Sequence, residues 1–147
     1  MEYANIIWGP HYAQDTQSLE RIQRRATKMI PELKLLSYEN RLRMLKLPSL
    51  AHRRRRGDMI FMFKLISGKL NLDPQSFFKI SETTTRGHKY KVFKKHAKKL
   101  TRINSFSQRV VNDWNALPAE IVEAKSIISF KNELDKYWRE EMYITPF

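Results

Sequence analysis

The sequence predicts a mainly α-helical fold: a small bundle of about five helices with a short extended or hairpin segment near residues 78–95. Apolar residues recur at helical spacing in the first half of the chain and again near its end. Capping residues stand at the ends of these segments, and the regular spacing is lost between them. Because 41% of the 147 residues are hydrophobic and 12% are aromatic, the chain can bury a core.

The first helix is expected to begin at a cap formed by Asp15 or Thr16 and to end at Pro31. Arginine and lysine side chains take its other faces. Its apolar positions, which we expect to face the core, are Leu19, Ile22, Ala26, Met29 and Ile30.

Two further helices are predicted within residues 1–72. A short one from about Ser37 to Lys46 offers Leu42 and Leu45 to the core. The next follows Pro48, with Ser49 as its cap, and runs to Ser67, where Gly68 ends it.

Residues 73–147 are expected to form a basic loop or hairpin followed by C-terminal helices, packed with residues 1–72 as one unit. Asp73 and Pro74 form a cap and a first turn, and Gly87 is placed for a turn before the alternating residues 89–92. Helices are predicted over 105–117 and 126–141, and the second carries Phe130, Leu134, Tyr137 and Trp138 on one face. Trp8, Trp114 and Trp138 are predicted core anchors.

The chain is strongly and unevenly basic. Its net charge is +13, with an isoelectric point of about 10.1, which is typical of nucleic-acid-binding domains. Residues 1–72 carry 14 basic and 6 acidic side chains, and residues 83–112 carry nine basic side chains and no acidic one. Residues 113–147 carry 4 basic and 7 acidic side chains. The positive charge therefore belongs to the first two segments, and a polyanionic partner is expected.

Several classes of site are not predicted. No cysteine is present, which excludes disulfides and thiol chemistry. The aspartates are scattered: Asp15 and Asp73 suit helix caps, Asp58 suits an ion pair near the arginine run, and Asp135 suits a solvated face. Most of the histidines are expected at the surface. We predict no catalytic residues, metal or cofactor, no membrane contact, and an intracellular protein of the nucleus or cytoplasm that is not secreted.

The basic clusters are the candidate binding residues. Four consecutive arginines on a helix point around more than half of its circumference, so some should contact phosphates while others pair with carboxylates. A solvated, salt-bridged face is the alternative. In the acid-free segment, Tyr90 and Phe93 are candidates for base stacking or for the core. The predicted nucleic-acid-binding residues are Arg21, Arg24, Arg25, Lys28, Arg53, Arg54, Arg55, Arg56, Arg86, Lys89, Lys91, Lys94, Lys95, Lys98, Lys99, Arg102 and Arg109.

Eight strings of the sequence, in a fixed order, carry a family resemblance. They are Glu2–Pro10, Leu19–Lys28, Ser37–Glu39, Leu47–Leu50, Arg55–Asp58, Arg86–His88, Phe106–Pro118 and Phe130–Trp138. Together they resemble the region that follows the polymerase palm in reverse transcriptases (RNA-directed DNA polymerases) of LINE-type, non-LTR retrotransposons of the jockey and chicken-repeat kind. The resemblance spans nearly the whole chain.

The resemblance implies that residues 1–72 form a thumb-like region and that the chain is the thumb and C-terminal tail of such an enzyme. The thumb and tail would grip RNA or an RNA/DNA hybrid, with DNA as a further candidate. Because the family's palm and endonuclease lie upstream of these strings, we expect no enzymatic activity from this chain. Two alternatives remain: a fragment that docks onto a palm-containing reverse-transcriptase chain through Tyr3, Ile7 and Trp8, and a translated relic without a selected role.

Overall fold

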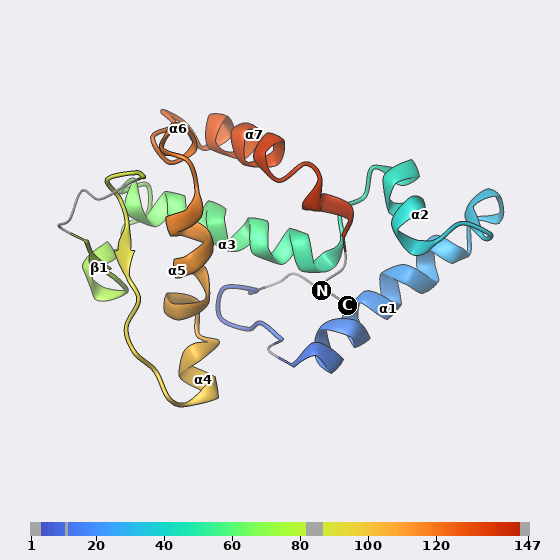
Figure 1. The fold of residues 1–147 in the computed structure, drawn as a ribbon, viewed down its shortest axis with the longest axis horizontal. Coiled ribbons are helices and arrows are strands. Elements are labelled where there is room, and N and C mark those ends of the chain that lie inside the picture. The colour runs from blue at the N-terminus through green and yellow to red at the C-terminus, as the bar shows by residue number, and fades with distance from the viewer. Residues whose placement is uncertain (1–3, 11, 82–86, 145–147) are drawn as a thin grey trace. The chain divides into compact units, whose positions relative to one another are not determined.

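The computed structural model describes residues 4–10, 12–81 and 87–144 and is mainly helical, as predicted (Figure 1). The described helices are α1 (Ala13–Lys28), α2 (Tyr38–Leu45), α3 (Leu50–Ile66), α4 (Leu100–Ile103), α5 (Phe106–Ala116), α6 (Ala119–Val122) and α7 (Ile127–Tyr137). Single 3₁₀ turns lie at η1 (Pro31–Leu33), η2 (Pro74–Ser76) and η3 (Glu141–Tyr143). The strands are β1 (Lys79–Ile80) and β2 (Val92–Phe93). The five longer helices match the predicted ones; the four-residue α4 and α6 were not predicted.

The chain divides into two compact units. The first unit comprises Met1–Arg55 with Trp138–Phe147, and the second comprises Arg56–Tyr137. Helix α3 contributes residues to both, and residue 72, where the sequence suggested a division, lies inside the second unit.

Helix α1, in the first unit, buries a polar face, which the sequence did not predict. Its N-cap is Tyr12, so the predicted caps are wrong, and Asp15 lies in its first turn. The predicted apolar face is also wrong, because Met29 is 79% exposed and Ile22 is exposed as well. The residues of α1 that are buried instead are Glu20, Gln23 and Thr27.

Hydrogen bonds explain why these polar residues point inward. A carboxylate oxygen of Glu20 accepts from the Tyr38 hydroxyl at 2.6 Å and from the Leu50 backbone N–H at 3.2 Å. Burial, followed by the bond to Glu20, raises the pKa of Tyr38 well above its ordinary value. Arg41 donates to the Thr27 hydroxyl at 3.2 Å and to a backbone carbonyl. These bonds offset part of the cost of burying the groups that make them, although the second carboxylate oxygen of Glu20 has no hydrogen-bond partner among the described residues.

The next two helices begin where expected, and the cap predicted at Ser49 is confirmed. The Ser37 hydroxyl accepts from the Asn40 N–H at the start of α2, and the Ser49 hydroxyl accepts from the His52 N–H at the start of α3. Gly68 follows α3 with a φ of 65°, a left-handed conformation that favours glycine. Of the two leucines predicted for the core of α2, Leu42 is fully buried but Leu45 is partly exposed.

The core of the second unit is aromatic. Phe63 of α3 and Phe130 of α7 stack with ring centroids 4.3 Å apart, and Phe61 meets Phe106 of α5 edge-on at 5.2 Å. Trp114 is fully buried beside Phe130. Helix α7 ends at Tyr137 rather than at 141, and Tyr137 faces solvent, unlike Phe130 and Leu134.

Trp8 and Trp138 belong to the first unit. Trp138 is buried as predicted, with the His52 ring edge-on at 5.8 Å. The prediction for Trp8 is wrong, because its side chain is half exposed.

A short antiparallel hairpin confirms the extended segment. Lys79 pairs with Phe93 and Ile80 with Val92. Helix α5 lies beside β2 (Figure 1), and its Asn115 amide bonds both backbone groups of Val92, at 3.0 and 2.9 Å. The residues between the strands at 82–86 lie outside the described part of the chain.

The expectation that most of the four histidines lie at the surface is wrong, because His52 and His88 are buried. The Nε2 of His88 lies 2.9 Å from the Trp114 carbonyl, which can only accept, so Nε2 carries the proton. Nδ1 has no hydrogen-bond partner among the described residues. Burial, reinforced by the Lys91 charge, lowers the pKa of His88, while the Trp114 carbonyl and Glu123 oppose the shift.

We expect His88 to make stability fall with acidification. Since its pKa is lowered in the folded state, the unfolded chain binds the proton more readily, so this contribution is complete above the ordinary pKa of about 6.5 and is lost as pH falls below it. Urea unfolding at a series of pH values should show a shallower pH slope for His88→Gln than for the wild type. His96→Gln, at an exposed site, is the control. Equal slopes for the wild type and His88→Gln would contradict the assignment.

Candidate nucleic-acid interface

The arginine run of α3 is largely occupied by contacts within the protein. Arg54 is buried, and Arg55 pairs with Glu141 while stacking on the Trp138 ring. Arg56 binds Asp135 through two N–H···O contacts of 2.5 and 2.8 Å. The prediction that some of these arginines pair with distant carboxylates is therefore confirmed, and the solvated face predicted for Asp135 is wrong. Arg53 is the exposed member of the run.

Arg109 of α5 is also committed to an ion pair. Its guanidinium donates to both oxygens of Asp58, at 2.8 and 2.9 Å, and both side chains are mostly buried. Asp58 does have a cationic partner, as predicted, and its bidentate partner is Arg109 of α5. Because a bidentate pair neutralises the guanidinium, Arg109 adds little to the basic surface.

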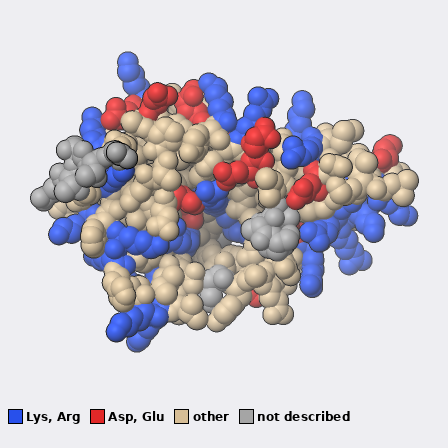
Figure 2. Space-filling view, viewed as in Figure 1, with Lys and Arg blue, Asp and Glu red and all other residues tan. Residues whose placement is uncertain are grey.

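In the second unit, a run of exposed candidate cations extends along the chain from the end of β2 into α4. We call Lys94, Lys95, Lys98, Lys99 and Arg102 the lysine surface. All five side chains are exposed, and none makes an ion pair with a described residue. Lys94 donates one hydrogen bond, to the Asn112 side chain at 3.2 Å. Figure 2 shows basic side chains over α4, at the lower left of the view.

The other candidates of the acid-free segment lie in different surroundings. Lys89 faces Glu123 at 3.8 Å, and Lys91 is half buried. Of the two stacking candidates, Phe93 is 60% exposed and stands opposite Lys79 in the hairpin, whereas Tyr90 is half buried. Phe93 is thus the more exposed of the two, and it precedes Lys94 directly in the chain. Arg86 lies outside the described residues.

Helix α1 presents a separate set of cations in the first unit. Arg21, Arg25 and Lys28 are exposed, and Arg24 lies over the Tyr38 ring at 4.9 Å. Basic side chains cover α1 in Figure 2. Two of them, Arg25 and Lys28, stand in its last turn, where positive charge complements the helix dipole.

The described residues form neither a metal-binding cluster nor a membrane-spanning helix. Within 4–10, 12–81 and 87–144, no three histidine, aspartate or glutamate side chains gather where they could share a metal ion. In the same ranges, no helix combines the length and apolar character needed to cross a bilayer.

Comparison with protein-family models, curated proteins and solved structures finds no match. The family resemblance of the sequence therefore stays a prediction.

Sequence reasoning found the lysine surface from charge alone but missed a pocket beside Tyr90. Its lining includes Ile66 and Glu123, which are far apart in the chain and were not considered as site residues. No local signal marks them, because their proximity depends on how α3 and the end of α6 pack.

Proposed function

We propose that this chain binds RNA or an RNA/DNA hybrid, with DNA as a further candidate, as the thumb and tail of a non-LTR retrotransposon reverse transcriptase. The lysine surface is the observation that carries the proposal. Its five exposed cations have no carboxylate partner in the described part of the chain, so they repel one another until a polyanion neutralises them.

Phosphate contact would supply most of the affinity. Lysine ammonium groups bind phosphate oxygens as point charges and carry little sequence information. Phe93, exposed beside them, offers a stacking surface that accepts any base. The chain would grip its partner without performing catalysis. A nucleic-acid partner implies an intracellular protein, in the nucleus or the cytoplasm, and not a secreted one.

Binding to labelled single-stranded RNA, RNA/DNA hybrid and DNA duplex, followed by fluorescence anisotropy at several salt concentrations, tests the proposal. If about six phosphates are neutralised, affinity should fall on the order of a thousandfold between about 50 and 200 mM salt. A preference for the hybrid would support the thumb assignment. No binding at low salt, or a flat salt response, would overturn the function.

Exposure at the start of the chain favours a second candidate, docking onto a palm-containing polypeptide. Ile7 is 89% exposed and Trp8 is half exposed, beside a turn at residues 4–7. Tyr3, the third residue predicted for this edge, lies outside the described residues. Large apolar side chains grouped in this way typically mark an interaction surface.

Replacing Ile7 and Trp8 by serine should reduce self-association of the isolated chain, because the two side chains would no longer offer apolar surface to another copy. Light scattering at increasing protein concentration measures the change. Leu35→Ser, at a position that is 98% exposed and distant in sequence from this edge, is the control. Docking through this edge is ruled out if the double variant associates as strongly as the wild type.

A further inference from the structure

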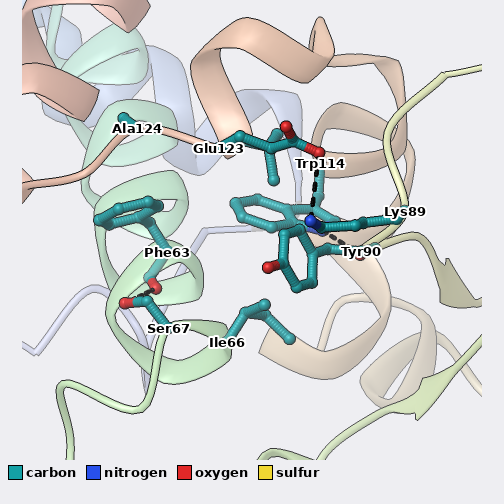
Figure 3. A pocket seen from close by; sticks show the side chains of 9 residues that line it. Phe63, Ile66, Ser67, Lys89, Tyr90, Trp114, Glu123 and Ala124 are labelled. Carbon is teal, nitrogen blue, oxygen red and sulfur yellow. Dashed lines mark hydrogen bonds and ion pairs between the residues drawn. The ribbon is translucent and has the colours of Figure 1, made fainter.

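A pocket of about 240 Å³ opens in the second unit beside the acid-free segment (Figure 3). Phe63 and Trp114, both buried, lie at its base, and Ile66 and Tyr90 line its sides. Its volume is below the roughly 300 to 1,000 Å³ of pockets that hold drug-sized molecules. The space therefore suits one small ring system rather than a larger ligand.

The aromatic side of the pocket is held in place by the core. The indole Nε1 of Trp114 donates to the Tyr90 backbone carbonyl at 2.8 Å. This bond fixes the backbone from which the Tyr90 side chain extends. Figure 3 shows the Tyr90 ring between Ile66 and Trp114. The half-buried Tyr90 ring thus offers a fixed surface on which a planar ligand can stack.

The mouth of the pocket carries two opposite charges. The Lys89 ammonium and the Glu123 carboxylate are 3.8 Å apart, beyond hydrogen-bond reach. Neither makes a hydrogen bond to another described side chain, and the two side chains are 59% and 45% exposed. Figure 3 shows them turned toward each other, and the Lys89 ammonium lies over the Tyr90 ring, 5.2 Å from its centroid. Donors and acceptors are therefore available side by side at the rim.

We propose that this pocket binds one unpaired guanine base of a nucleic acid, with Tyr90 stacking on its ring, Glu123 accepting from its N1–H and N2–H₂ groups, and Lys89 donating to its O6. The inference deepens the proposed function, on which it rests, by adding a base-specific contact to phosphate binding. Lys89, predicted as a phosphate contact, instead reads a base edge.

Guanine is the base that fits because of the order of groups on its Watson–Crick edge. It presents one carbonyl acceptor next to two adjacent N–H donors, and the two oxygens of a carboxylate can accept from both donors. Adenine and cytosine offer a single exocyclic amine, and uracil offers a single N–H. An ammonium next to a carboxylate thus complements guanine more completely than it complements the others.

Nucleosides test the pocket apart from the lysine surface, because they carry no phosphate. We would titrate the full chain with guanosine, inosine, adenosine, cytidine and uridine and follow binding by NMR. Inosine is guanosine without the N2 amine, so it should bind about tenfold more weakly. Glu123→Gln should abolish this preference, whereas Glu120→Gln, a nearby exposed change outside the pocket, should keep it.

Tyr90 variants test the stacking. Tyr90→Leu should weaken guanosine binding by about fivefold or more, and Tyr90→Phe should retain it. Equal binding of guanosine and inosine, or a preference that survives Glu123→Gln, would overturn the proposal. If the chain selects guanosine but does not bind RNA, the guanine site is supported and the proposed function is wrong. Failure of the guanine site and failure of the proposed function can therefore be distinguished.

Discussion

Changing Lys94, Lys95, Lys98 and Lys99 to glutamine should weaken RNA binding on the order of a hundredfold at about 100 mM salt. Each lysine that contacts a phosphate releases a counterion on binding, so losing four should also make the dependence of log K on log salt shallower by about 3. Anisotropy titrations of the variant over the salt series measure both quantities. Since all four side chains are exposed, folding should be unaffected, which circular dichroism can check.

The matched control removes four cations from elsewhere. Lys125, Lys131, Lys136 and Arg139 lie in the acidic last part of the chain, and Lys136 already pairs with Glu133 at 2.8 Å. Changing these four to glutamine alters the net charge equally but should leave most of the affinity. If both quadruple variants lose the same affinity, binding follows net charge and the lysine surface is not the interface.

Phe130→Ala should lower the free energy of unfolding by about 3 to 5 kcal/mol, which approaches the whole stability of many domains. The ring is fully buried and stacks on Phe63 at 4.3 Å, so truncation leaves a cavity between α7 and α3. Urea denaturation measures the loss. Ile128→Ala, on the same helix but 71% exposed, should change stability little. A loss below about 1 kcal/mol for Phe130→Ala would contradict a central place for this residue in the core.

Local signals predicted most of the helix ends. Three predicted helix starts carry a side chain that accepts a hydrogen bond from a backbone N–H two or three residues later in the chain: Ser37, Ser49 and Asp73. Serine and aspartate prefer such positions, so these starts are visible in the sequence. Which face of α1 is buried could not be predicted from such local signals. Glu20 is buried because Tyr38 and the Leu50 N–H, 18 and 30 residues away, supply its hydrogen bonds.

In the candidate site, too, some features can be predicted from the local sequence and others depend on distant residues. Exposure of the lysine surface follows from a segment rich in lysine that has no acidic residue nearby in sequence. The loss of Arg56 and Arg109 to ion pairs depends on partners 79 and 51 residues away, so charge counting alone could not separate them from the exposed cations. His88 was missed for a similar reason, because its burial depends on the Trp114 backbone.

The polar face of α1 has a thermal consequence. Of the buried apolar side chains in the described ranges, five belong to the first unit (Leu33, Tyr38, Leu42, Leu50 and Trp138) and fifteen to the second. Exposure of apolar surface is what raises the heat capacity when a protein unfolds. The first unit therefore contributes less to that increment than the second, and the curvature of the whole chain's stability curve comes mainly from the second unit.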